Sequence, residues 1–237
     1  METAQQTVGF AHFLAQTDGV GKFLLVVLAA MSVLSWYLIV IKAFANWLER
    51  RRSNGLLELF WSSPSTSVVQ RHLEDKRENG GPEDSFSRLA SHAVSARSKG
   101  DGEFLIRAMR RVMDEETVRH ESGLTALASI GATAPFVGLF GTVWGVYHAL
   151  VAIGLSGQGT LDKVAGPVGE ALIMTALGLA VAIPAVLAYN AFVRANRVVL
   201  ARLDAFAHDL FAVLTTGSQV GEAPAGVMQL KPAVARS

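Results

Sequence analysis

Three long runs of hydrophobic residues divide the chain, and polar segments separate them. The first run is Phe23–Ile41, the second is Gly131–Gly154, and the third is Glu170–Val193. Glu170 is the only Asp, Glu, Lys or Arg residue in the three runs. A membrane-spanning helix needs about 20 mainly apolar residues, and each run has about that length. The pattern therefore predicts an all-α integral membrane protein with three transmembrane helices.

The second and third runs share a second pattern, in which small residues recur three or four positions apart. Helices in lipid associate through close backbone approach at small residues, because they gain little by hiding apolar surface from each other. We therefore expect these two helices to pack against other helices. Each run also contains one proline. The predicted helix-packing residues are Gly138, Gly141, Gly145, Gly178, Pro135 and Pro184.

Charged and aromatic residues at the ends of the first run indicate how it crosses the membrane. Lys22 and Lys42 bracket it, and the basic residues Arg50–Arg52 follow. A cleaved signal peptide would carry its positive charge before the apolar run, so the order of charge here favours a retained membrane anchor. Basic residues prefer the cytoplasmic side, which predicts a periplasmic N-terminus and a cytoplasmic C-terminus.

These patterns divide the chain into seven segments, alternating between the two sides of the membrane. The predicted segments are a periplasmic N-terminal segment (1–22), transmembrane helix 1 (23–41), a cytoplasmic helical loop (42–127), transmembrane helix 2 (128–152), a periplasmic loop (153–169), transmembrane helix 3 (170–193), and a cytoplasmic helix with a mobile tail (194–237).

The large polar region shows helical periodicity of its own. Residues Asp84–Ser98 place Phe86, Leu89, Ala90, Ala93 and Val94 on one face, which predicts an amphipathic helix. Another helix starts near Gly102, and we expect it to continue without interruption into the second span, because Gly123 alone only weakens a helix. The third span should continue through Arg194–Leu214. The second and third transmembrane helices thus extend into the cytoplasm and pack there with the loop helices.

Composition agrees with this class and excludes several functions. Of the 237 residues, 51% are hydrophobic and 17% are charged, which is too apolar for an ordinary soluble domain. A net charge of +1 gives no reason to expect nucleic-acid binding, and the absence of cysteine excludes disulfides and thiolate chemistry. Phosphate-loop, zinc-protease and serine-hydrolase motifs are absent from the sequence. We therefore expect no enzyme activity, no cofactor and no metal.

Three polar residues in or at the edge of the spans are candidates for ion handling. Thr142 and Thr175 lie inside the second and third runs, and Glu170 begins the third. Each has an ordinary alternative: a buried threonine often bonds its own helix backbone, and an acid is favoured at a helix N-terminus. His148, near the outer end of the second span, fits a headgroup or helix contact better than proton transfer. Because the runs contain no Asp, Lys or Arg, we expect that, if protons cross here, a second protein supplies the titrating acid.

Two segments carry a resemblance to a known family. GLFGTVWGVYHALVAIG (Gly138–Gly154) and AGPVGEALIMTALGLAVAIPAVLAYN (Ala165–Asn190) resemble the ExbB/TolQ family of proton-driven bacterial inner-membrane motors, related to the proton channel MotA. The likeness is closest to ExbB-type members, and TolQ-type members share nearly all of these residues. MotA-type chains have a fourth span, which this sequence lacks. The family commonly has a small residue where this chain has Met174.

The resemblance implies a specific assembly and role. It implies a homopentamer in a lipid membrane, with ExbD-like helices in a central pore and a TonB-like protein that receives the energy. It also implies energised outer-membrane import of iron-siderophores, vitamin B12 and haem. By motif, Thr142 and Thr175 would line the pore and Glu170 would lie at its mouth. Two alternatives stay open: a TolQ-like role in outer-membrane integrity, and a passive membrane scaffold. An intramembrane enzyme is disfavoured, because no nucleophile–base pair is visible in the sequence.

Overall fold

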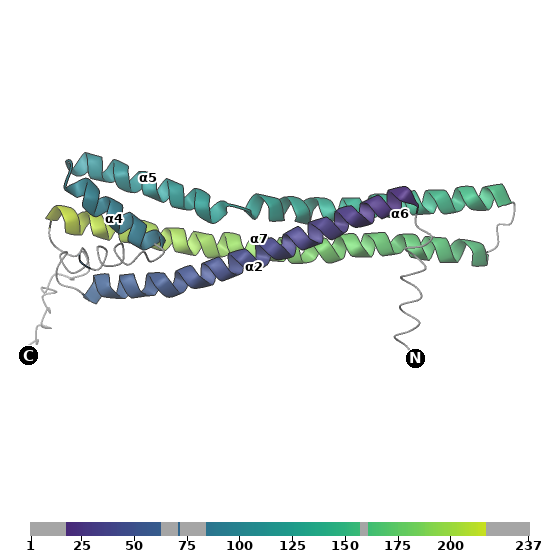
Figure 1. Cartoon of the computed structure of the whole chain (residues 1–237), viewed down its shortest axis with the longest axis horizontal. Helices are drawn as coiled ribbons and strands as arrows, with labels where there is room; N and C mark the ends of the chain where they lie inside the picture. Colours follow the sequence, from purple (N-terminus) through teal and green to yellow (C-terminus); the bar gives the residue numbers. More distant parts are fainter. Residues whose placement is uncertain (1–17, 63–70, 72–83, 157–160, 217–237) are drawn as a thin grey trace, which may run out of the picture. The chain divides into compact units, whose positions relative to one another are not determined.

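The described residues of the chain are almost entirely helical. The computed structural model describes residues 18–62, 71, 84–156 and 161–216. Within them lie α2 (Gly19–Ser62), α4 (Ser85–Arg97), α5 (Gly102–Glu121), α6 (Leu124–Ser156) and α7 (Leu161–Thr216) (Figure 1). This part of the chain contains no strand. Three helical segments are long and apolar enough to cross a membrane: Gly19–Ser53, Gly102–Leu155 and Ala171–Thr216. The predicted all-α membrane fold with three spans is confirmed.

The chain separates into two compact units, which share three long helical segments. The first unit comprises Met1–Trp47 and His120–Arg197, and the second comprises Leu48–Arg119 and Val198–Ser237. The first unit therefore contains the three apolar runs, and the second contains the polar region with the C-terminal part of α7.

In the first unit, α6 and α7 pack closely as an antiparallel pair. Gly131 lies against Val186, Gly138 against Gly178, and Gly145 against Ala171, so residue numbers rise along one helix as they fall along the other. The α2 helix packs on this pair through two apolar clusters. The buried members of these clusters are Leu24, Leu28, Ala134, Met174 and Ala182 in one, and Leu124, Leu127, Ile130, Ala185 and Phe192 in the other.

The second unit has a separate hydrophobic core built by α2, α4, α5 and α7. Phe206 of α7 makes edge-on ring contacts with Phe60 of α2 and Phe86 of α4, at centroid distances of 4.9 Å and 5.6 Å. Such edge-on aromatic pairs contribute about 0.5–1.5 kcal/mol beyond the burial of area. Residues Phe86, Leu89, Ala90 and Ala93 of α4 are buried, and the predicted amphipathic helix is confirmed. The extended second and third helices pack with the loop helices as predicted.

The prediction of one uninterrupted helix from Gly102 through the second span is wrong at one point. A turn at Ser122–Gly123 separates α5 from α6, and Gly123 has a φ of +77°. Only glycine adopts this left-handed conformation without steric cost, so the chain can end one helix and begin the next within two residues. A glycine that only weakens an isolated helix can end it when tertiary contacts support the turn.

Helix α7 begins earlier than the third hydrophobic run. It starts at Leu161, so Glu170 lies inside the helix, and the interpretation of Glu170 as a residue at the helix N-terminus is wrong. Helix α2 also continues past the first run to Ser62. The predicted periplasmic segment 1–22 lies largely outside the described residues, and so does the predicted mobile tail after residue 216.

Candidate functional site

Thr142 and Thr175 meet inside the α6–α7 pair. Their hydroxyl oxygens lie 2.5 Å apart, and either can be the donor. Thr142 is buried, with 9% of its surface exposed, while Thr175 is partly exposed. Two residues that are far apart in the sequence thus form one polar contact in an otherwise apolar helix interface.

The Thr142 hydroxyl lies close to more hydrogen-bond acceptors than its single proton can bind at once. Its Oγ1 lies 3.2 Å from the carbonyl oxygen of Gly138 in its own helix and 3.2 Å from that of Ala171 in α7. A hydroxyl has one proton to donate and two lone pairs that accept. The Thr142 proton can therefore point to either carbonyl or to Thr175, and Thr175 can donate in return. This pair can reorient its hydrogen bonds without moving either helix, as a proton relay requires.

Small residues on both helices bring the two threonines together. Gly138 and Gly178 face each other, and a Cβ on Gly138 would lie 2.6 Å from the carbonyl oxygen of Met174. A Cβ on Gly141 would instead meet the end of the Met174 side chain at 2.7 Å. Met174 is itself buried, so this large side chain fills the space beside Gly141 next to the threonine pair.

The other residues predicted for this site lie on the same two helices. Pro135 is inside α6, and Pro184 is inside α7. Glu170 immediately precedes Ala171, whose carbonyl accepts the Thr142 contact, but the side chain of Glu170 lies outside what the structure describes. Its predicted place at a pore mouth stays a prediction.

A second polar group joins the start of α2 to the end of α6. Asp18 Oδ1 accepts from the backbone N–H of Gly21, and its Oδ2 accepts from Trp144 Nε1 at 2.7 Å. The His148 ring lies 4.7 Å from the Trp144 ring by centroid, and its Nε2 is 3.9 Å from Asp18 Oδ2. Desolvation by burial would raise the pKa of Asp18. The hydrogen bonds from Gly21 and Trp144, with the charges of His148 and Lys22, outweigh it and lower that pKa.

A third polar group satisfies the backbone where α5 ends. The carbonyl oxygen of His120 accepts from Lys42 Nζ of α2 and from Asn196 Nδ2 of α7, each at 2.7 Å. The last carbonyls of a helix have no partner within it, and a helix that ends inside a protein needs such donors. Lys42 and Asn196 therefore support the turn at Gly123.

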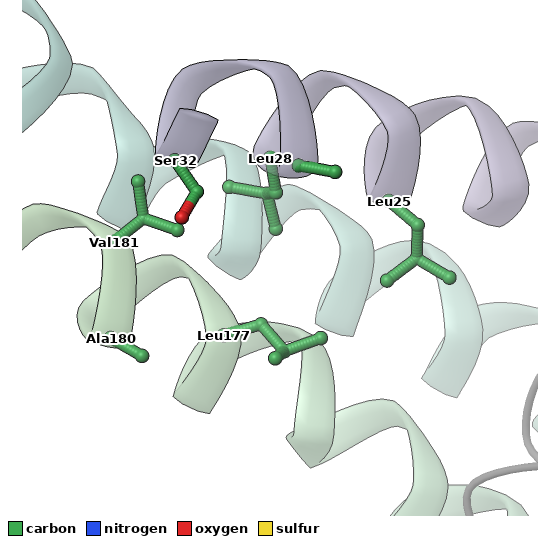
Figure 2. Close-up of a pocket in the computed structure, with 7 residues that line it drawn as sticks. Leu25, Leu28, Ser32, Leu177, Ala180 and Val181 are labelled. Carbon is green, nitrogen blue, oxygen red and sulfur yellow. The ribbon is translucent and has the colours of Figure 1, made fainter. Parts of the chain in front are cut away.

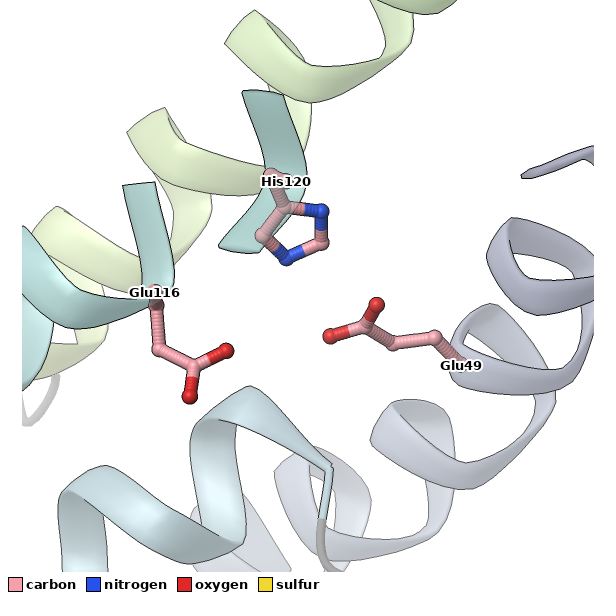
Figure 3. Close-up of side chains that lie close together, drawn as sticks. All are labelled: Glu49, Glu116 and His120. Carbon is pink, nitrogen blue, oxygen red and sulfur yellow. The ribbon is translucent and has the colours of Figure 1, made fainter. Parts of the chain in front are cut away.

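Two acidic side chains approach each other inside the second unit. The Glu49 carboxylate of α2 and the Glu116 carboxylate of α5 point toward the same space in Figure 3, with oxygens within 4.8 Å of one another. Ser85 contacts both, at 2.7 Å to Glu116 Oε2. Glu116 is fully buried, and its Oε1 lies 2.7 Å from Arg88 Nη1, although the angle is not that of a hydrogen bond. Arg88 supplies one positive charge beside the Glu116 carboxylate.

The contacts made by Lys42, Asn196 and Glu116 were not expected from the sequence. A signal existed for Glu116, which follows Leu105, Met109 and Val112 on one helical face, and all four are buried. An acid on an apolar helical face predicts a buried ionic contact. Asn196 likewise falls on the face that carries Phe192 and Leu203.

Comparison with known proteins adds evidence independent of this geometry. The MotA/TolQ/ExbB proton channel family matches residues 78–205. The chain is 42% identical to the biopolymer transport protein ExbB of Xanthomonas campestris pv. campestris, over 92% of each chain. It is 40% identical to that of Neisseria meningitidis, over 81% of this chain and 89% of the relative. The Tol-Pal system protein TolQ of Pseudomonas aeruginosa is 33% identical, over 81% of this chain and 87% of the relative.

Proposed function

Because this chain belongs to the MotA/TolQ/ExbB proton channel family, we propose that it is the ExbB-like subunit of a motor driven by the proton-motive force. Its relatives and its three apolar helices support a multi-pass protein of the bacterial inner membrane. In this proposal the N-terminus is periplasmic and the C-terminus is cytoplasmic, because the basic residues after the first span favour that side.

The observation that carries the proposal is the contact between Thr142 and Thr175. It places two reorientable hydroxyls in an apolar interface without an ionisable partner among the described residues around it. Polar groups at membrane depth are costly and commonly mark ion pathways. Glu170, which precedes the Thr142-bonded residue Ala171, is the third member of the proposed path.

The proposed assembly supplies the acid that these helices lack. Several copies of the chain, five by family resemblance, would surround ExbD-like helices that carry a titrating carboxylate. An ionised carboxylate is expensive next to an apolar wall, by about 2.5–3.5 kcal/mol on insertion scales. Protonation removes this cost and allows the partner helices to move, and a TonB-like protein transmits that motion to outer-membrane importers. Iron-siderophores, vitamin B12 and haem are the proposed cargo.

Identity favours this role over that of TolQ. The two ExbB relatives given above reach 42% and 40% identity, whereas the TolQ relative given above reaches 33%. A TolQ-like role in outer-membrane integrity is the second candidate, since the two groups share the spans. Expression of the chain in two bacterial strains distinguishes the two roles. In a strain that lacks ExbB the readout is growth on siderophore iron, and in a strain that lacks TolQ it is resistance to detergent.

The central experiment removes the hydroxyls one at a time. Thr142→Val and Thr175→Val keep the side-chain shape but cannot relay a proton, so siderophore-dependent growth should fall at least tenfold with protein level unchanged. Thr142→Ser and Thr175→Ser should retain most of the activity. Thr133→Val is the matched control, because Thr133 is exposed on α6 and bonds only its own helix, to the carbonyl of Ser129 at 2.7 Å.

Two results would contradict the proposal. Full growth of both valine variants would remove the threonines from the mechanism. A partner protein whose acid can be neutralised without loss of growth would favour a passive scaffold over a motor. Glu170→Gln extends the test to the proposed pore mouth, where loss of growth at normal protein level is expected.

A further inference from the structure

A groove runs along the first unit between α2 and α7, separate from the threonine pair. Its volume is about 360 Å³. Figure 2 shows side chains of α2 and α7 directed toward each other across it. Ser32 is its only residue with a polar side chain; the lining residues are Leu25, Leu28, Ala29, Ser32, Leu177, Ala180 and Val181. A volume of this size is within the range of ligand-binding pockets.

The groove is open because small residues occupy its rim. Ala29 of α2 and Ala180 of α7 are both exposed, while Leu28 is buried at the contact between the helices. Larger side chains at either alanine would fill the space. The lining lies within two segments that are long and apolar enough to cross a membrane, so in a bilayer the groove would lie at the depth of the hydrocarbon core.

Charged residues continue the same face of α2 beyond the groove. Asp18 immediately precedes α2, and Lys22, Leu25, Ala29 and Ser32 follow at spacings of four, three, four and three residues, which places these four residues on one side of α2. Lys22 is exposed, and its charge is among those that lower the pKa of Asp18. Lys22 therefore lies one turn before Leu25, beyond the N-terminal end of the groove, and the Asp18 carboxylate, which faces Trp144 and His148 of α6, lies one turn further.

The length of this face matches one leaflet of a bilayer. From Lys22 to Ser32 the helix rises about 15 Å, which is half of a hydrocarbon core of about 30 Å. With Lys22 at the headgroup level, the groove would reach the middle of the membrane. A phospholipid has charged groups and an acyl chain at these same two heights.

We propose that this groove binds one phosphatidylethanolamine molecule, with an acyl chain between α2 and α7, its phosphate on Lys22 and its ammonium on Asp18. The phosphate accepts hydrogen bonds from the Lys22 ammonium, and the Asp18 carboxylate accepts from the lipid ammonium, both charge-assisted. Trp144 holds the Asp18 carboxylate in place through its 2.7 Å hydrogen bond. An anionic lipid without an amine would face repulsion from Asp18.

Native mass spectrometry of the full-length protein, titrated with palmitoyl-oleoyl phosphatidylethanolamine or phosphatidylglycerol, tests the proposal. Ala29→Phe should weaken phosphatidylethanolamine binding by roughly tenfold, the change expected when about two methylene groups are excluded. Ala30→Phe is the matched control, since Ala30 is exposed on the same helix outside the groove, and it should bind like the unmodified protein. Ala180→Leu fills the groove from the opposite helix and replaces Ala29→Phe if that variant does not fold.

The headgroup contacts are tested separately. The unmodified protein should prefer phosphatidylethanolamine over phosphatidylglycerol several-fold. Asp18→Asn should remove that preference, and Lys22→Met should weaken the binding of both lipids. Equal binding by Ala29→Phe and Ala30→Phe, or no preference between the two lipids, would overturn the proposal.

A second copy of the chain is the competing occupant. The sequence has no cysteine, so Ala29→Cys provides a single thiol. Disulfide-linked dimers of Ala29→Cys in membranes, together with unchanged lipid binding by Ala29→Phe, would show that protein fills the groove. These readouts do not depend on proton transport, so they can fail while the proposed function stands.

Discussion

Gly138 of α6 and Gly178 of α7 pack backbone against backbone, and a Cβ added to either residue would lie 3.1 Å from the Cα of the other. The closest obstacles are carbonyl oxygens, at 2.6 Å from a Cβ on Gly138 and 2.7 Å from one on Gly178. Side-chain rotation cannot relieve a clash with backbone, so a larger residue must separate the helices. The threonine pair lies on the same interface, one turn from each glycine.

Gly138→Ala and Gly178→Ala should each destabilise the protein by about 1–3 kcal/mol, the usual cost of overpacking. Thermal unfolding in detergent measures the loss. Gly154→Ala is the matched control, because a Cβ there meets nothing within 4 Å and alanine is a better helix former than glycine. That variant should be neutral or slightly stabilised. Equal melting temperatures for Gly138→Ala and Gly154→Ala would contradict the close packing.

Much of this fold could be predicted because apolar periodicity reports burial directly. The three hydrophobic runs gave the three candidate spans, and the spacing of Phe86, Leu89 and Ala93 gave α4 and its buried face. The small-residue spacing also indicated which positions allow close helix contact. These features depend on neighbours along the sequence, which a single sequence contains.

The features that could not be predicted depend on contacts between distant residues. Gly123 and Gly138 are both glycines next to helical patterns, yet one ends a helix and the other lies inside one. The difference is that Lys42 and Asn196 satisfy the carbonyl of His120 near Gly123. Likewise, the pairing of Thr142 with Thr175 needs the register of α6 against α7, which the sequence does not specify without the fold.

Arg88 is predicted to stabilise the second unit through its ion pair with Glu116. Glu116 is fully buried, whereas Arg88 retains 28% side-chain exposure. Removing one partner of a buried pair leaves an uncompensated charge, at a cost of about 3–5 kcal/mol. The loss of stability in Arg88→Met should be near the lower end of this range, because Arg119 stays 3.7 Å from the same carboxylate. Chemical denaturation measures the change.

The control for this ion pair is Arg107→Met, which breaks the exposed Glu103–Arg107 pair on α5. Exposed pairs contribute about 0–1 kcal/mol. A double variant, Arg88→Met with Glu116→Gln, should recover part of the stability because it removes the buried charge. If Arg88→Met and Arg107→Met had the same effect, the buried pair would have no special role.

The carbonyl of His120 should show coupling between its two donors. Asn196→Leu alone leaves Lys42 as a donor to the carbonyl, and Lys42→Met alone leaves Asn196. Each single substitution should therefore reduce the stability of the protein less than the double substitution does. The double variant leaves a buried acceptor with neither donor, which costs about 1–3 kcal/mol. A double-mutant cycle by thermal unfolding measures the coupling. Asn190→Leu, at an exposed position on α7, is the control, and strict additivity would contradict the shared contact.

Asp18 should make stability sensitive to acid. Its pKa is lowered from the ordinary value of 3.8, because the hydrogen bonds from Gly21 and Trp144 and the charges of His148 and Lys22 outweigh desolvation. A carboxyl whose pKa is lower in the folded state stabilises the fold above its unfolded pKa, and this contribution is lost as pH falls through the folded value. The contribution of Asp18 is therefore complete at neutral pH and is lost below about pH 4.

Asp18→Asn keeps a good helix-capping side chain but removes the charge. It should melt at a lower temperature than the unmodified protein near neutral pH, and the difference should shrink at about pH 3. Trp144→Phe removes one donor to the carboxylate, so it should reduce the same acid-dependent difference without removing the charge. Melting temperatures of the three proteins across this range provide the test. A difference that stays constant with pH would show that the Asp18 charge does not stabilise the junction of α2 and α6.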